Sequence, residues 1–394
     1  MLIEDSNTTF IVKGRVEVLY GDAYVFGCKV KLVENSTFFP LYLKEGRILI
    51  DGEFIPVKGS TIPKSWYKLA EKLDNYSKIF LIGKTDSGKS SLATWIINNF
   101  EDKVCIIDAD IGQSDVAHPG AMGFGVAEKV PFIRDVSMID GFFVGTITPM
   151  NRESKCLRGF SSICKKSNKL GFKLTIVDTT GWITGKKARE YKMAKIESFS
   201  PDLVVFIGES DSYNIYKENI DCECVRVESF VPKKRDREWR VKIRRNLYRR
   251  WFESVSEFEL TPDLLIGTTL FRGKEIEDKD LLSALSIFGD VVYAELSNEF
   301  LNVCVEKAEV SAEAVKMIKD AFNVEEINVF ERDWFEGLIC GIYSGNKYIC
   351  PGKVASVDFE NRILKIVARE LPKNVKVELG EFRLNEREEF VRLP

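Results

Sequence analysis

The sequence is poor in side chains on which many enzymes depend. Its 394 residues include one histidine, His118, and nine cysteines with no Cys-x-x-Cys pair among them. A Ser-His-Asp triad, a histidine-rich metal centre and a zinc ribbon therefore lack the residues that they need. Cys222 and Cys224 flank a single residue, but two ligands without neighbouring partners make a poor metal site. Chemistry must rest on Lys, Arg, Asp, Ser and backbone groups.

Long apolar runs are also missing. No stretch approaches the roughly 18 residues that a membrane-spanning helix needs, and the N-terminus, MLIEDSNTTF, does not resemble a signal peptide. We therefore expect a cytoplasmic protein with no membrane partner. The composition, 45% hydrophobic and 30% charged, is typical of a globular protein, and the length favours two or three domains.

The two ends of the chain have β patterns. Residues 1–72 alternate apolar and polar positions around turn signals at Gly21-Asp22 and Asp51-Gly52, which predicts an N-terminal β domain. Residues 259–394 return to such alternation and predict a C-terminal β-rich α+β domain. We expect one helix there, near 312–322, with Ser311 as its N-cap.

Residues 73–258 have a different pattern, in which short apolar runs alternate with helical stretches. The runs SKIFLI, VCIID, LTIVD and DLVVFIG are continuously apolar, as strands buried on both faces of a parallel sheet should be. The fold class is therefore α/β, with a central doubly wound domain between the two β-rich domains.

The strongest motif is GKTDSGKS, residues 83–90, which fits G-x-x-x-x-G-K-[ST] between an expected strand and an expected helix. A coincidental turn is the alternative, and the flanking elements disfavour it. Glycines let backbone N–H groups converge on phosphates, Lys89 should reach the terminal phosphates, and the Ser90 hydroxyl should bind Mg²⁺. The predicted nucleotide-binding residues are Gly83, Lys84, Thr85, Asp86, Ser87, Gly88, Lys89, Ser90 and Ser91.

Carboxylates follow two of the expected strands. Asp108 and Asp110 end VCIIDADIGQSD, and Asp178 ends LTIVD. Residues at i and i+2 of an extended chain share a face, so Asp108 and Asp110 can point into one cleft, one toward a metal and one toward an attacking hydroxyl. The alternative is that both only form the turn after the strand.

Two further segments suit nucleic acid. Trp182 lies directly beyond the strand that Asp178 ends, where a ring can stack on a base, although core packing is what most tryptophans do. Residues 231–250 hold ten Lys or Arg and two acidic residues, which fits polyanion binding or a solvated helix. Apolar residues recur there every four positions, which predicts a lid helix over about 235–252 carrying Arg240 and Arg244.

Together, GKTDSGKS, DADIGQ, TTGW and Arg240-x-x-x-Arg244 resemble, in the same order, four motifs of the polynucleotide 5′-hydroxyl kinases. These are the phosphate loop, the D-x-D-x-G-Q segment, the T-x-G-W clasp and the R-x-x-x-R lid. The family is related to the eukaryotic RNA cleavage-complex and pre-rRNA-processing kinases, and this chain is similar to a prokaryotic or archaeal member. The three-domain pattern agrees, so the likeness covers nearly the whole length.

The resemblance implies transfer of the γ-phosphate of ATP to the 5′-hydroxyl of RNA or DNA, with Mg²⁺ and with RNA-processing partners. It makes Asp110 the group that activates the hydroxyl and Arg240 and Arg244 the groups that close over the phosphate, with Lys89 as the fourth catalytic residue. Substrate contacts would come from Gln113, Thr179 and Trp182. Ser90 and Asp108 would hold the metal.

HPGAMGFG, from His118, and GTITP, residues 145–149, resemble loop segments of the family near the substrate. For His118 we expect a solvated loop position and not an acid–base role. An ATP-binding scaffold without activity is the main alternative function, although the motif residues are all present. The absence of N-K-x-D argues against a GTPase. The motifs leave open RNA against DNA and ATP against GTP.

Overall fold

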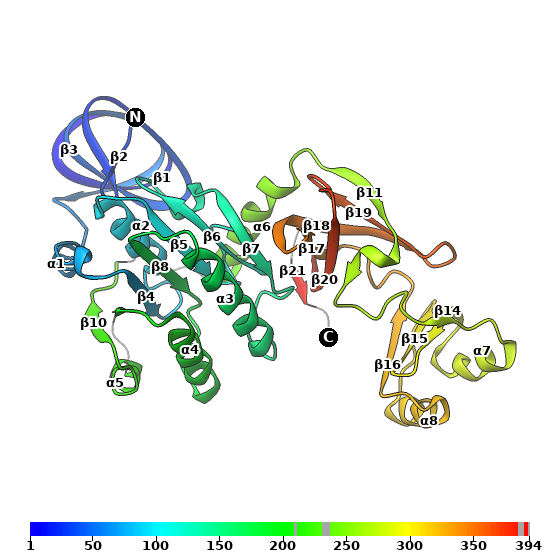
Figure 1. The fold of residues 1–394 in the computed structure, drawn as a ribbon. Coiled ribbons are helices and arrows are strands. Elements are labelled where there is room, and N and C mark those ends of the chain that lie inside the picture. The colour runs from blue at the N-terminus through cyan, green and yellow to red at the C-terminus, as the bar shows by residue number, and fades with distance from the viewer. Residues whose placement is uncertain (209–210, 231–236, 385–389, 393–394) are drawn as a thin grey trace. The chain divides into compact units, whose positions relative to one another are not determined.

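The structure, a computed structural model, describes residues 1–208, 211–230, 237–384 and 390–392, without the side chains of 237–240, 242, 243 and 390–392 (Figure 1). Contacts between Cα atoms divide the chain into two compact units, Met1–Arg244 and Arg245–Pro394, which are described separately. No helix in the described residues is both long and apolar enough to cross a membrane.

The first unit begins with two long strands that wrap around one another (Figure 1, blue). Thr9 of β1 pairs with both Tyr42 and Val57 of β3, so β3 flanks β1 on both sides. The inward-facing side chains fill a shared core, as an alternating pattern predicts. The strands are β1 (Leu2–Val25), β2 (Cys28–Lys29) and β3 (Leu32–Lys58).

The hairpin turns predicted at Gly21-Asp22 and Asp51-Gly52 are wrong, because both sites lie inside continuous strands. Gly52 pairs with Gly14 across the sheet, and the two have φ values of 142° and 135°. A Cβ at Gly14 would lie 2.2 Å from the carbonyl oxygen of Asp51. Glycine here lets two paired strands bend closely together without ending either one.

The central sheet has the strand order β10-β9-β4-β8-β5-β6-β7. The first five strands are parallel, and they include all four apolar runs that the sequence predicts as buried strands. β6 and β7 add an antiparallel edge, so most of the segment expected as a loop after His118 is strand. The bounds are β4 (Lys78–Gly83), β5 (Val104–Ala109), β6 (Ala121–Ala127), β7 (Met138–Phe143), β8 (Leu174–Thr179), β9 (Leu203–Ile207) and β10 (Glu223–Val227).

Each face of the central sheet packs against a different core. Ile79 and Leu81 of β4 belong to the core shared with β1 and β3, whereas Phe80 and Ile82 belong to the opposite one. The first core takes in α1 and α2, and the second takes in α3, α4 and α5. The helices are α1 (Lys64–Ala70), α2 (Lys89–Asn99), α3 (Glu153–Asn168), α4 (Lys186–Phe199), α5 (Ser212–Lys217) and α6 (Arg237–Phe252), with 3-10 turns at Leu73–Asn75 and Ile133–Asp135.

The second unit contains a larger sheet, in the order β11-β19-β18-β17-β20-β12 with β21 beside β20, and a smaller one, in the order β13-β14-β15-β16. The helix predicted near 312–322 is confirmed, and the Ser311 hydroxyl accepts from the Ala314 N–H at its start. The elements are β11 (Ser256–Leu260), β12 (Leu265–Ile266), β13 (Lys274–Glu275), α7 (Lys279–Leu285), β14 (Val291–Leu296), β15 (Phe300–Val305), α8 (Ala312–Phe322), β16 (Glu326–Glu331), β17 (Leu338–Ser344), β18 (Lys347–Asp358), β19 (Ile363–Ala368), β20 (Val375–Leu384) and β21 (Phe390–Arg392), with 3-10 turns at Pro262–Leu264 and Ser286–Phe288.

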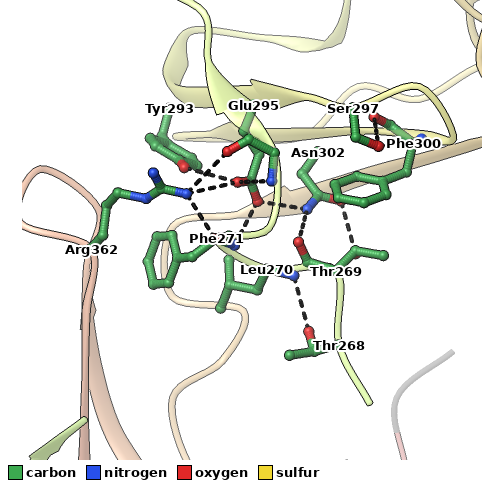
Figure 2. A network of polar contacts seen from close by, with 11 residues as sticks. Thr268, Thr269, Leu270, Phe271, Tyr293, Glu295, Ser297, Phe300, Asn302 and Arg362 are labelled. Carbon is green, nitrogen blue, oxygen red and sulfur yellow. Dashed lines mark hydrogen bonds and ion pairs between the residues drawn. The ribbon is translucent and has the colours of Figure 1, made fainter. Parts of the chain in front are cut away.

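One buried carboxylate ties the segments of this second unit together (Figure 2). Glu295 of β14 is fully buried and accepts from the Phe271 N–H at 2.6 Å, the Gly273 N–H at 2.9 Å and the Asn302 amide at 2.8 Å. Arg362, one residue before β19, donates to the same carboxylate at 3.3 Å. The connection between β12 and β13 is thereby fastened to both sheets.

The mixed α/β class with a central parallel-stranded sheet is confirmed by these sheets. We keep the division into residues 1–72, 73–258 and 259–394 as a proposal. The first sheet ends at Lys58, the central sheet at Val227, and the sheets of the second unit begin at Ser256.

Candidate active site

The loop between β4 and α2 has the backbone of a phosphate cradle. Gly88 has φ 92° and Asp86 has φ 58°. A Cβ at Gly88 would lie 2.7 Å from the Phe230 carbonyl oxygen, and one at Gly83 would lie 2.4 Å from the Ser87 hydroxyl. Gly88 is therefore required sterically, and Gly83 leaves room for the Ser87 hydroxyl. The loop runs directly into α2, whose N-terminal N–H groups and partial positive charge favour an anion.

Lys89 is the first residue of α2 and is only 7% exposed. Its ammonium donates to the carbonyl oxygens of Gly83 at 3.2 Å and Lys84 at 2.9 Å, so the side chain curls back over the loop that it follows. An ammonium held by neutral carbonyls at a phosphate cradle is placed to exchange those partners for phosphate oxygens.

Ser90 reaches across to the neighbouring strand. Its hydroxyl donates to Asp178 Oδ2 at 2.7 Å, at the end of β8. Within the described residues, Oδ1 of Asp178 is buried and has no hydrogen-bond partner. An orphaned carboxylate oxygen beside a hydroxyl is a fitting pair of hard oxygen ligands for Mg²⁺. No group of three or more acidic, histidine or cysteine side chains in the described chain would hold a metal alone, so phosphates and water would complete the shell.

Burial raises the pKa of Asp178 to about 6, although the Lys89 ammonium and the hydrogen bond from Ser90 oppose the shift. The pKa of Asp108 is raised well above its usual value, mainly by burial and then by repulsion from Asp178. A divalent cation beside Asp178 would favour its ionised form, because an opposite charge stabilises a carboxylate.

The structure gives Asp108 a different set of partners from those of a metal ligand. Its Oδ1 accepts from the Asp110 N–H at 3.0 Å, and its Oδ2 accepts from the Ser114 hydroxyl at 3.0 Å and the N–H groups of Asp115 at 2.6 Å and Val116 at 3.1 Å. These contacts hold the turn after β5. The metal role of Asp108 stays a prediction, and its contacts favour Asp178 for that position.

Asp110 lies one residue beyond β5 and is half-buried. Its Oδ1 accepts from the Gly112 N–H at 3.0 Å and the Gln113 N–H at 3.3 Å, which fixes the plane of the carboxylate. Gln113 thus joins the site through its backbone, and its side chain is half-buried. This geometry is consistent with the predicted base, whose role stays a prediction.

The segment Thr179–Trp182 adjoins the phosphate loop. A Cβ at Gly181 would lie 2.3 Å from the Thr85 backbone nitrogen, so the two backbones touch. Trp182 is half-buried, and its ring lies against Tyr191 at 5.8 Å between centroids with a 35° tilt. Thr179, expected to touch substrate, is fully buried, and its hydroxyl donates to the Leu81 carbonyl oxygen at 2.9 Å.

The far side of the loop is held by the segment that follows β10. The Ser229 hydroxyl donates to the Ser87 carbonyl oxygen at 2.8 Å. One residue earlier, the Glu228 carbonyl oxygen accepts from the Trp66 indole at 2.9 Å, and the Glu228 carboxylate accepts from the Ser65 hydroxyl at 2.9 Å. Helix α1 and the phosphate loop are therefore linked through residues 228–229.

The predicted lid helix corresponds to α6, on which Arg240 and Arg244 lie about one turn apart. The Arg240 side chain is outside the described residues, and that of Arg244 is half-buried. The same helix continues into the second unit, where Leu247 is buried and Trp251 packs against the core. The lid role of both arginines stays a prediction.

His118 is not the solvated loop residue that we expected. It is fully buried, its Nδ1 lies 2.7 Å from the Pro119 carbonyl oxygen, and its ring is 6.3 Å from that of Phe143. Two buried lysines of α4, Lys192 and Lys195, were not predicted from the sequence. Their spacing of three residues was the available signal, but charged side chains at such spacing normally face solvent.

Comparison with known proteins agrees with this geometry. Residues 83–254 match the model of the family described as mRNA cleavage and polyadenylation factor CLP1 P-loop. A polyribonucleotide 5′-hydroxyl-kinase of Thermococcus kodakarensis is 26% identical over 351 residues, covering 84% of this chain and 96% of the relative. One from Pyrococcus furiosus is 28% identical over 261 residues, covering 64% and 73%.

These findings support a member of the polynucleotide 5′-hydroxyl kinase family. The resemblance seen in four short motifs is thereby confirmed, and the curated relatives are archaeal. A further such kinase, from Pyrococcus abyssi, is 24% identical over 340 residues, covering 82% of this chain and 93% of the relative.

Solved structures extend the likeness of fold beyond the phosphate-loop region. Wild-type Clp1p in complex with residues 454–563 of Pcf11p matches with a TM-score of 0.66 and 12% identity, over 97% of each chain. A second structure of Clp1p and Pcf11p matches with a TM-score of 0.64 and 13% identity, over 97% of this chain and 98% of that one. The likeness of fold therefore spans nearly the whole chain.

Proposed function

We propose that this protein transfers the γ-phosphate of ATP to the 5′-hydroxyl end of RNA. The observation that carries the proposal is the meeting of two segments at one end of the central sheet, the phosphate loop with the start of α2 and residues 178–182. The phosphate loop contacts Thr179–Trp182 through Thr85 and Gly181, and Ser90 bonds Asp178. The family and its named archaeal kinases supply the reaction class.

Mg²⁺ fits the site through Ser90 and Asp178, because one offers a hydroxyl and the other an orphaned carboxylate oxygen. When bound, the ion would neutralise charge on the transferring phosphoryl group. The chain itself binds the phosphates through loop N–H groups and Lys89, whose ammonium exchanges its carbonyl partners for phosphate oxygens.

Asp110 would accept the proton of the attacking 5′-hydroxyl. Two backbone N–H groups donate to its Oδ1 and so orient the carboxylate. Oδ2 would then accept the proton. Trp182 would stack on the terminal base. Its ring packs against Tyr191, and this contact would hold the ring in place for stacking. Arg240 and Arg244 would neutralise the phosphate in flight, as cations at the transferring group do in phosphoryl transfer.

The decisive experiment is transfer of label from γ-labelled ATP to a short 5′-hydroxyl RNA. The DNA of the same sequence, a 5′-phosphorylated RNA and Lys89→Ala protein accompany it. We expect label on the 5′-hydroxyl RNA and none on the 5′-phosphorylated RNA, and only with Lys89 intact, while the DNA arm ranks the two kinds of 5′-hydroxyl end. ATP binding without transfer to either nucleic acid would contradict the proposal and support an inactive scaffold.

A further inference from the structure

Helix α4 carries two lysines that are completely buried. Lys192 and Lys195 are both 0% exposed and lie three residues apart, so they share one face of the helix. Lysine is almost never fully buried unless its ammonium has partners, because taking a charge out of water is costly. The partners of these two ammonium groups therefore show which neighbouring segments helix α4 holds in place.

Lys192 is directed at the two threonines that open the Thr179–Trp182 segment. Its Nζ donates to the Thr179 hydroxyl at 2.9 Å, the Thr180 carbonyl oxygen at 2.8 Å and the Thr180 hydroxyl at 3.3 Å. All three N–H bonds of the ammonium are thus used on two successive residues. The Thr179 hydroxyl in turn donates to the Leu81 carbonyl oxygen of β4, which links Lys192 to that strand.

The partners of Lys195 are different. Its Nζ lies 3.4 Å from the Ala109 carbonyl oxygen, and it sits over the rings of Phe160 at 5.0 Å and Tyr191 at 4.7 Å. Cation–π contact with two rings compensates part of the burial cost. Of the two lysines, Lys192 is the one whose donors all go to the segment that precedes Trp182.

We propose that Lys192 is a positioning residue for the 5′-hydroxyl substrate, because its ammonium fixes Thr179 and Thr180 and so the presentation of Trp182. The inference rests on the proposed kinase function. The segment is held at two points: Lys192 donates to Thr179 and Thr180, and Thr85 of the phosphate loop lies against Gly181.

The contact geometry ties Lys192 to one short segment. Any fully buried ammonium needs partners. Each donor of Lys192 ends on the Thr179-Thr180 pair, whereas Lys195 reaches one carbonyl oxygen and two rings. Burial lowers the pKa of Lys192 well below its usual value, while Asp110 and Asp178 oppose this shift.

The test is Lys192→Met, which keeps most of the side-chain length and removes the three donors. We expect the KM for 5′-hydroxyl RNA to rise about tenfold, as loss of hydrogen bonds from a charged group allows, and the KM for ATP to stay within about twofold. Lys78→Met is the matched control. Lys78 donates to Phe199 at the other end of α4, at 3.2 Å, where β4 begins.

Thr179→Val is the second variant, because it removes the hydroxyl that Lys192 and Leu81 share at nearly unchanged volume. It should show the same selective rise in the RNA KM even where Lys192→Met does not fold. Equal rises in both KM values, or no rise in Thr179→Val, would overturn the inference. Wild-type protein that binds ATP but labels no RNA would overturn the proposed function, and this inference with it. Active wild type with an unaffected RNA KM in the variants would overturn this inference alone.

Discussion

The Thr85 backbone nitrogen lies 2.3 Å from the point that a Cβ at Gly181 would occupy. The Thr85 hydroxyl oxygen is equally close to that point, so the donor loop packs against the backbone of the proposed acceptor segment at Gly181. Gly181 follows Thr180, which Lys192 holds, and precedes Trp182. The distance between the phosphate loop and residues 179–182 therefore depends on the absence of a side chain at Gly181.

Gly181→Ala should lower kcat/KM for RNA at least tenfold, because the methyl group forces the loop and the segment apart. Overpacking of this kind costs about 1 to 3 kcal/mol in stability, so the protein should still fold. Gly171→Ala is the control, since a Cβ at Gly171 meets nothing within 4 Å although its φ of 67° is unfavourable. Equal kinetics for wild type and Gly181→Ala would show that the loop and the segment can move apart without loss of activity.

Asp178→Asn should stabilise the nucleotide-free protein and abolish turnover. The pKa of Asp178 is about 6 in the fold against a usual 3.8. From about pH 4 to 6 the folded state retains a proton that the unfolded state releases, so this group lowers the free energy of unfolding as pH rises, by about 3 kcal/mol in full.

Denaturation of wild type and Asp178→Asn at pH 4 and pH 7 measures this effect. The stability advantage of the variant should be larger at pH 7 than at pH 4. An advantage that is independent of pH would mean that Asp178 ionises normally in the fold.

Asp110→Asn should reduce kcat by about 10² to 10⁴, the range typical of a general base, and leave ATP affinity nearly unchanged. Asparagine keeps an acceptor oxygen for the N–H groups of Gly112 and Gln113, so the turn should persist. Single-turnover phosphorylation with saturating RNA separates chemistry from binding. A fully active variant would remove the assignment of Asp110 as base.

Trp182→Ala should weaken binding of a 5′-hydroxyl oligonucleotide by about 1 to 3 kcal/mol, the usual value of one stacked base. Trp182→Phe should retain most of that affinity, because Tyr191 would still brace an aromatic ring. Fluorescence anisotropy with labelled RNA and a separate ATP titration provide the comparison. Parallel losses of RNA and ATP affinity would assign Trp182 to packing.

Glu295→Ala should destabilise the second unit by about 3 kcal/mol or more and leave ATP binding by the phosphate loop intact. The change leaves the buried Phe271 and Asn302 donors and the Arg362 guanidinium without their carboxylate. Thermal denaturation followed by calorimetry checks the loss, with Glu299→Ala as a control at an exposed position. An unchanged melting temperature would mean that water replaces the carboxylate at no cost.

Sequence patterns with a short range predicted the structure well. The four apolar runs are parallel strands, the phosphate loop lies between β4 and α2, and Ser311 caps α8. Each of these depends on neighbouring residues, so periodicity and capping chemistry are sufficient.

Features that depend on distant residues escaped the sequence. Gly21 and Gly52 look like turn residues until their strand partners are known, and only then become bends. His118 is fully buried beside Phe143 of β7, a strand that no apolar run predicted. The partners of Lys192 lie 12 and 13 residues away along the chain, outside its own helix. Such contacts depend on which elements become neighbours in the fold, and a local sequence pattern does not carry this information.

The hydrogen bond from the Trp66 indole to the Glu228 carbonyl oxygen makes Trp66 an intrinsic fluorescent probe of the segment next to the phosphate loop. Trp66 is fully buried, and the segment that it touches continues through Ser229 to the phosphate loop. Indole emission depends on the partner of its N–H and on local polarity. A difference spectrum between wild type and Trp66→Phe, recorded as ATP is added, therefore reports whether this segment changes, without any attached dye.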